Sequence, residues 1–237
     1  MTARAARGRT FARMGALVRP SGTIARARWR ARDPVSGYSH LVGLFLAAFG
    51  MLALLALSRG AAEIATSLTY GVCLVAVYAA SSAYHLVRAD DRVLLRLRKL
   101  DHGAIFLMIA GSSTPIFWRA FDGATRAWML GGVWALALVG IAFRVLWMKA
   151  PRVLYTMMYV AMGWLFVVRG PDGFLALPRA AIVLILAGGV TYTLGAIVYA
   201  LERPNPLPRV FGFHEIWHLF VLGGSALHYG AMVVLVT

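Results

Sequence analysis

The sequence predicts an all-α membrane protein, a seven-transmembrane helix bundle with the amino terminus in the cytoplasm and the carboxyl terminus outside. Composition is the first observation behind this prediction. The 237 residues are 60% hydrophobic and only 14% charged, and the mean hydropathy is +0.72. Such a chain is too apolar for an ordinary soluble domain and is typical of a protein surrounded by lipid. The single cysteine, Cys73, excludes an intrachain disulfide and a metal site built from thiolates alone.

The second observation is the recurrence of long apolar runs. A helix needs roughly 20 residues to cross a hydrocarbon core of about 30 Å, and backbone polar groups in lipid require partners within the same segment, which favours helices. Glycine, proline and charged residues in the intervening breaks are typical of helix ends. The predicted spans are residues 38–57, 64–87, 102–118, 127–147, 153–168, 180–201 and 213–235.

The third observation is the distribution of basic residues. Cytoplasmic loops of membrane proteins are enriched in lysine and arginine. Nine arginines lie in residues 4–32, and the second, fourth and sixth breaks hold most of the others when Arg144 is counted with the fourth. The first, third and fifth breaks hold few. This pattern places the amino terminus in the cytoplasm.

The same arginines divide the chain into two parts. Residues 1–32 are predicted to be a disordered basic cytoplasmic tail, and residues 33–237 the seven-helix membrane domain. We expect the tail to contact anionic lipid headgroups and to fix the topology. An Arg-rich, acid-poor transit peptide is the alternative. Nucleic-acid binding is not expected, because the rest of the chain lies in the lipid bilayer.

The last predicted span begins with a metal-binding pattern. Residues 214–218 read "HEIWH", which matches the H-E-x-x-H signature of zinc metalloproteases. The i, i+4 spacing places His214 and His218 on one face of a helix, where both can bind one ion. Catalytic zinc usually has three protein ligands and an open position, so a third ligand must come from another helix.

The predicted topology assigns a depth to each histidine. His228 lies about 15 Å beyond His218 along the helix and cannot join the site. Ionisable groups within spans are costly, so a cluster at one depth predicts a functional site. The histidines expected near the cytoplasmic leaflet are His40, His85, His102, His214 and His218.

His85 is the third ligand that we predict, because it brings a neutral imidazole from the end of the second span. Ser81 lies one turn earlier on the same face, and Asp101 lies at a matching depth, where it can act as the base for a water molecule at the metal. Two alternatives remain open: Asp101 can cap the third helix, and Ser81 can bond to its own helix. For the remaining histidines we expect roles in packing and interfacial hydrogen bonding.

Four segments in order carry a resemblance to a known family. The segments "DPVSGYSHLVG", "SSAYHLV", "KLDHGAIFLMIAGSSTPI" and "FHEIWHLFVLGGSALHY" resemble the hemolysin III family of bacterial membrane proteins, part of the progestin and adipoQ receptor superfamily. The resemblance runs from about Asp33 to the end of the chain.

The resemblance implies seven helices around a zinc ion near the cytoplasmic side, held by His85, His214 and His218, with Ser81 and Asp101 beside it. In the first segment the family commonly has glutamate where Asp33 stands beside Pro34, so the role of this position stays open.

The resemblance implies a multi-pass protein of the plasma membrane and several functions. We expect a ceramidase-like, zinc-dependent hydrolase of lipid amides or esters. Its lipid substrate would bind in the bundle cavity, and its role would be in membrane lipid homeostasis. A receptor or membrane-state sensor with structural zinc is the alternative, and a pore-forming lysin is a further one. An intramembrane protease is disfavoured, because relatives can have glutamine at the position of Glu215. The chain also has "FDG" and "PDG" in place of the L-D-G motif of such proteases.

Overall fold

The computed structural model describes residues 31–166, 171–208 and 210–237. The predicted tail, residues 1–32, therefore lies outside the described residues except for its last two. The described chain is helical, with one isolated β-bridge between Leu207 and Phe211. Its helices are α2 (Pro34–Leu57), α3 (Ala61–Leu86), α4 (Asp91–Ala120), α5 (Gly123–Leu146), α6 (Arg152–Gly163), α7 (Pro171–Leu175), α8 (Arg179–Leu201) and α9 (Phe213–Val236).

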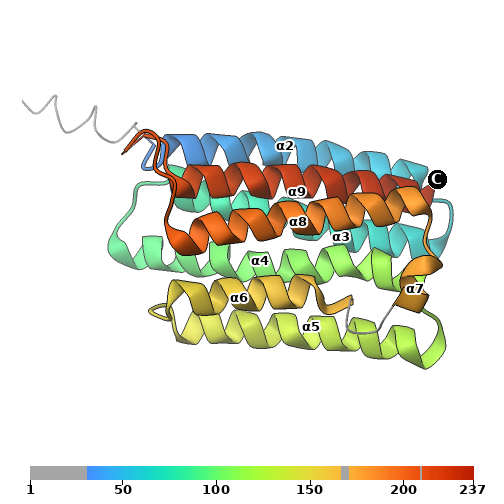
Figure 1. Ribbon diagram of the computed structural model, residues 1–237. Coiled ribbons are helices and arrows are strands. Elements are labelled where there is room, and N and C mark those ends of the chain that lie inside the picture. The colour runs from blue at the N-terminus through green and yellow to red at the C-terminus, as the bar shows by residue number, and fades with distance from the viewer. Residues whose placement is uncertain (1–30, 167–170, 209) are drawn as a thin grey trace, which may run out of the picture. The chain divides into compact units, whose positions relative to one another are not determined.

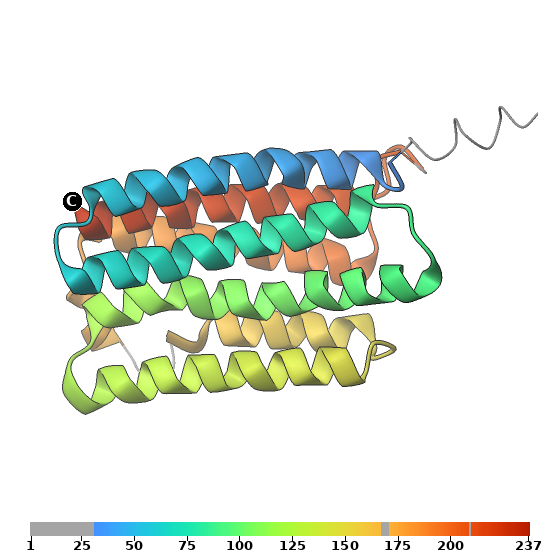
Figure 2. The ribbon, with the colours of Figure 1, turned by 180° about the vertical axis from the view of Figure 1, so that it is seen from behind.

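The long helices lie side by side and alternate in direction along the chain (Figure 1). α2 packs against α3 and α9, α4 packs between α3 and α5, and α6 packs against α8 (Figures 1 and 2). The start of α2 and the carboxyl terminus lie at opposite ends of this bundle (Figure 1). As a result, the end of α3 and the starts of α2, α4 and α9 lie at one end.

Among the described residues, five helices are long and apolar enough to cross a membrane, namely α2, α3, α5, α8 and α9. The predicted span 102–118 lies within α4, and the predicted span 153–168 corresponds to α6, which has only 12 residues. The all-helical prediction is thus confirmed for the described residues. The count of seven spans and the orientation of the termini stay predictions.

The start of α4 differs from the sequence prediction. The sequence predicts a polar break between the spans 64–87 and 102–118, but α4 already begins within it, at Asp91. Its N-cap residue, Asp90, accepts a hydrogen bond from the backbone N–H of Val93 at 2.9 Å. Leucine, arginine and lysine, which dominate the first turns, favour helix. Charge therefore does not end the helix here, because the capping residue and helix propensity extend it.

Arg144 also differs from the prediction, which counted it as a basic loop residue. Its side chain is fully buried at the end of α5. The guanidinium donates to the carbonyl of Trp147 at 3.2 Å and lies 4.1 Å above the ring of Tyr155. Carbonyls at a helix carboxyl terminus attract a cation, which explains why this arginine turns inward.

Candidate metal site

Three histidines meet where α3 ends and α9 begins. His85 comes from the last turn of α3, and His214 and His218 come from the first two turns of α9. The Nε2 atom of His214 lies 3.3 Å from Nε2 of His85 and 3.2 Å from Nε2 of His218. Each residue offers a ligand atom within 4.8 Å of the other two. The structure therefore brings together the three residues predicted as ligands.

The spacing of these nitrogens fits a metal ion. Zn–N bonds of 2.0–2.1 Å in a tetrahedral site separate two ligand nitrogens by roughly 3.3 Å. The two Nε2 separations, 3.3 and 3.2 Å, agree with this value. An all-imidazole set suits zinc and other late transition metals, whereas magnesium and calcium prefer oxygen ligands. The triad can thus hold one metal ion.

Asp33 fixes the orientation of the His85 ring. Its Oδ2 atom lies 3.1 Å from Nδ1 of His85 and 3.0 Å from Nε of Arg32. The hydrogen bond from His85, together with Arg32, lowers the pKa of Asp33 to about 2. An ionised carboxylate can only accept, so Nδ1 of His85 carries a hydrogen, and in the neutral ring this leaves the lone pair on Nε2.

Hydrogen bonds alone do not satisfy the triad well. With a lone pair on Nε2, His214 faces the lone pair of His85, which is repulsive. With a hydrogen on Nε2, His214 must share it between His85 and His218. A cation between the three Nε2 atoms accepts all three lone pairs at once, which supports the metal interpretation.

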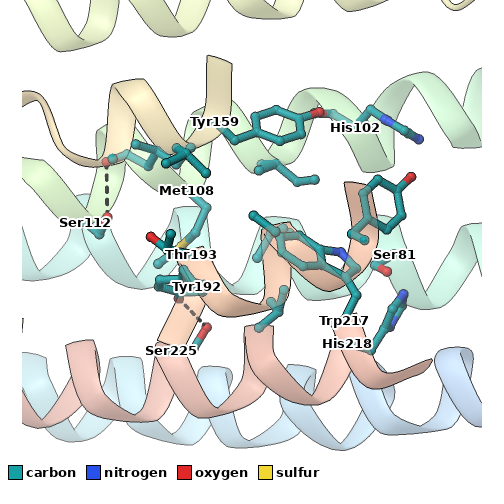
Figure 3. Close-up of a pocket in the computed structure, with 18 of the residues that line it drawn as sticks. Ser81, His102, Met108, Ser112, Tyr159, Tyr192, Thr193, Trp217, His218 and Ser225 are labelled. Carbon is teal, nitrogen blue, oxygen red and sulfur yellow. Dashed lines mark hydrogen bonds between the residues drawn. The ribbon is translucent and has the colours of Figure 1, made fainter. Parts of the chain in front are cut away.

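The triad opens into a cavity of about 460 Å³ within the bundle. Ser81, Trp217 and His218 lie at one end of it, and Ser112, Tyr192 and Ser225 lie toward the other (Figure 3). Much of the wall between these ends is aliphatic and aromatic, as in most small-molecule sites. The apolar residues of the wall include Ile105, Met108, Ile109, Ile116, Phe117, Tyr159, Val160, Ile185 and Val221.

Ser81 and Asp101 line the same cavity as the three histidines. The Ser81 hydroxyl lies 2.8 Å from Nδ1 of His40 and also interacts with the Asp101 carboxylate. These two contacts link Ser81 to α2 and to α4. Asp101 is not the cap of α4, since that helix begins ten residues earlier. The alternative role of Asp101 as a cap of α4 is thus excluded.

Comparisons with known proteins decide the family. The model of the "Haemolysin-III related" family matches residues 28–229. "Hemolysin-3 homolog" of Bacillus subtilis is 33% identical over 192 residues, covering 79% of this chain and 86% of that protein. "Hemolysin-3" of Bacillus cereus is 35% identical over 192 residues, covering 80% and 84%. The chain belongs to the haemolysin-III-related family.

A distant match extends the relationship. "Adiponectin receptor protein" of Drosophila melanogaster is 28% identical over 215 residues, covering 81% of this chain and 48% of that protein. This match supports the link to the progestin and adipoQ receptor superfamily. Family membership and the five apolar helices identify this haemolysin-III-related protein as a multi-pass membrane protein.

Two further histidines, for which the sequence predicts packing and hydrogen bonding without naming partners, lie near the site of this haemolysin-III-related protein. The His40 ring stacks on the His218 ring, with centroids 3.8 Å apart and planes at 31°. His102 lines the cavity and accepts a hydrogen bond at Nδ1 from Nη2 of Arg144 at 3.0 Å. Because a guanidinium can only donate, His102 is neutral and carries its hydrogen on Nε2. The spacing in the sequence could have indicated that His40 lies near the site, because it follows Asp33 by seven residues and therefore shares its helix face.

Glu215 serves the helix rather than the metal site. Its Oε2 atom accepts from the backbone N–H of Gly212 at 2.8 Å, and its Oε1 atom accepts from the Ser36 hydroxyl at 3.0 Å. The first contact caps α9 in the manner of a capping box. Both carboxylate oxygens are therefore engaged, and the H-E-x-x-H pattern in this haemolysin-III-related protein does not place its glutamate as a free base.

Proposed function

We propose that this protein is a zinc-dependent hydrolase that cleaves amide or ester bonds of membrane lipids, in the manner of a ceramidase, in membrane lipid homeostasis. One observation carries the proposal. Three imidazoles at the spacing of zinc ligands share a cavity with a carboxylate, Asp101, and a largely apolar wall. A metal site, a base and a chamber for an acyl chain are the parts that such hydrolysis needs.

The ligands of the ion are His85, His214 and His218. A bound zinc ion supplies Lewis-acid polarisation of a carbonyl and makes water a stronger nucleophile near neutral pH. Asp101 accepts a proton from the attacking water and later returns it to the leaving nitrogen or oxygen, so that an acid and an amine or alcohol are released. Ser81 holds Asp101 in place through the contact between them.

The rest of the cavity binds the lipid. Its aliphatic and aromatic wall holds the acyl chain and excludes water, which strengthens electrostatic interactions at the reacting end. The hydrogen on Nε2 of His102 is a donor for a polar group of the lipid, because Arg144 occupies the other ring nitrogen.

The membrane arrangement is part of the same proposal. Residues 33–237 form a domain of seven crossing helices in the plasma membrane, with the triad near the cytoplasmic side. The alternating directions of the long helices support an odd number of crossings, since the two ends of this domain lie at opposite ends of the bundle (Figure 1). Residues 1–32 contact anionic lipid headgroups as a basic cytoplasmic tail.

A second candidate is a receptor or membrane-state sensor in which zinc has a structural role. The observation that favours it is that the triad joins two helices, α3 and α9, so that an ion ties them together without any reaction. The name of the insect relative, "Adiponectin receptor protein", also points to a receptor. The name "Hemolysin-3" points to lysis, for which the cavity and the triad offer no specific support.

Substitution of Asp101 separates the two candidates. We expect Asp101→Asn to lower the turnover of N-acyl and O-acyl lipids in mixed micelles by 10²- to 10⁴-fold, because the amide cannot accept the proton. Zinc per chain should not change. The measurement is product release by mass spectrometry beside metal content.

Asp122→Asn is the matched control for this substitution, since Asp122 lies at the far end of the bundle and is exposed. Unchanged turnover in Asp101→Asn removes Asp101 as the base. A zinc-loaded wild type that cleaves none of the lipids favours the receptor.

A further inference from the structure

Three residues at the start of α2 face the metal site, although α2 supplies no ligand. Asp33 immediately precedes the helix, and Ser36 and His40 follow at three and seven residues, a spacing that keeps them on one helix face. α2 packs against both α3 and α9 (Figure 2), which are the two helices that carry the ligands. This face is therefore placed to hold the two ligand helices in register.

Asp33 reaches α3 through two contacts with one ligand residue. Its backbone N–H donates to the carbonyl of His85 at 2.9 Å, and its carboxylate accepts from Nδ1 of His85 at 3.1 Å. The first contact ties the last turn of α3 to the start of α2. The second fixes the rotation of the imidazole ring and the position of its hydrogen.

Arg32 holds Asp33 from the outer side. Its Nε atom lies 3.0 Å from Oδ2 of Asp33, and its guanidinium lies 4.1 Å above the ring of Tyr84, the residue before His85. His85 is 3% exposed, whereas Asp33 is 42% exposed. The chain Arg32–Asp33–His85 thus runs from the partly exposed surface to the buried ligand.

The other two residues of this face reach α9. The Ser36 hydroxyl donates to Glu215 at 3.0 Å, beside His214, and the His40 ring stacks on the His218 ring. Neither contact involves a ring nitrogen of a ligand. Asp33 is the residue of this face whose side chain contacts a ring nitrogen of a ligand, Nδ1 of His85.

We propose that Asp33 is a positioning residue of the metal site, which holds His85 with Nε2 toward the ion and thereby tightens zinc binding. The inference rests on the zinc site of the proposed function. Histidine ligands commonly donate their second ring N–H to a carboxylate, and loss of such a partner typically weakens metal affinity 10- to 100-fold. This assigns a role to the position that the resemblance left open.

The experiment measures the zinc dissociation constant by competition with a chelator of known affinity, on full-length protein in detergent. We expect Asp33→Ala to weaken zinc binding about 10- to 100-fold. Asp33→Glu retains a carboxylate and should bind zinc more tightly than Asp33→Ala. The melting temperature of the metal-free protein is measured for each variant, because a merely structural role changes that temperature and leaves the dissociation constant unchanged.

Asp122→Ala is the matched control. Asp122 is also the N-cap residue of a long helix, α5, makes no capping bond with its side chain and pairs with an arginine, Arg126. We expect Asp122→Ala to bind zinc as tightly as the wild type does. If Asp33→Ala and Asp122→Ala bind zinc equally well, the positioning role is wrong and the zinc site stands. If the wild type binds no zinc, both the site and the inference are wrong.

Discussion

The triad and His102 lie in the lining of one cavity, yet their ring nitrogens face different groups. Nε2 of His214 faces two other imidazole nitrogens at 3.2 and 3.3 Å. Nδ1 of His102 faces the guanidinium of Arg144 at 3.0 Å. Nδ1 of His102 thus has a permanent cation supplied by the protein, whereas Nε2 of His214 faces other imidazole nitrogens. We expect the triad to be completed by an ion taken from solution instead.

The residues that bond to His102 and to His85 also differ in burial. Arg144 is fully buried and also bonds to carbonyls at the end of α5, so its charge is compensated within the fold. Asp33, the partner of His85, is 42% exposed. The region around His102 is therefore expected to be complete without metal, and the region around the triad is expected to depend on it.

Metal removal should give the largest contrast between the two regions. Zinc at 1,000 times its dissociation constant stabilises the folded state by about 4 kcal/mol, because it binds the assembled triad and not the unfolded chain. We expect a chelator to lower the melting temperature of the wild type, and the effect to vanish in His218→Ala. The measurement is a thermal melt in detergent with and without chelator.

His102→Gln is the control for this melt, since glutamine keeps an acceptor for Arg144. The decrease in melting temperature that the chelator causes in His102→Gln should match the decrease in the wild type. A chelator effect that persists in His218→Ala contradicts the assignment of the stabilising ion to the triad.

Removal of Arg144 should lower the stability less than metal removal does, and its effect should be confined to the region around His102. Arg144→Met leaves Nδ1 of His102 without a donor, and an unsatisfied buried acceptor costs about 1–3 kcal/mol. We expect a lower melting temperature of the metal-free protein and an unchanged zinc content. Arg126→Met, which breaks an ion pair with the exposed Asp122, should cost less than about 1 kcal/mol. Loss of zinc in Arg144→Met means that the two regions are not separate.

The sequence predicted the parts of the fold that depend on local patterns. Runs of apolar residues located the long helices, because hydropathy and length are properties of single segments. The first turns of α4 were missed, since a capping residue and helix propensity outweigh charge there. The triad was predicted because i, i+4 spacing and depth along a helix can be counted from the sequence.

The pairs that surround the triad could not be predicted in the same way. Asp33 and His85 are 52 residues apart, and His102 and Arg144 are 42 apart. Whether such residues meet depends on the rotation of each helix about its axis and on side-chain rotamers, which packing between helices decides. Arg144 was counted as a loop residue for this reason, although its side chain is directed into the bundle.

The most direct test of the metal site is zinc per chain, measured by inductively coupled plasma mass spectrometry on detergent-purified protein. Wild type, His85→Ala and His214→Ala are compared with His228→Ala, which changes a cavity residue about 15 Å from the triad. The expected result is about one zinc per chain in the wild type and in His228→Ala, and its loss in the other two variants. Normal zinc in His85→Ala would contradict a site shared between α3 and α9.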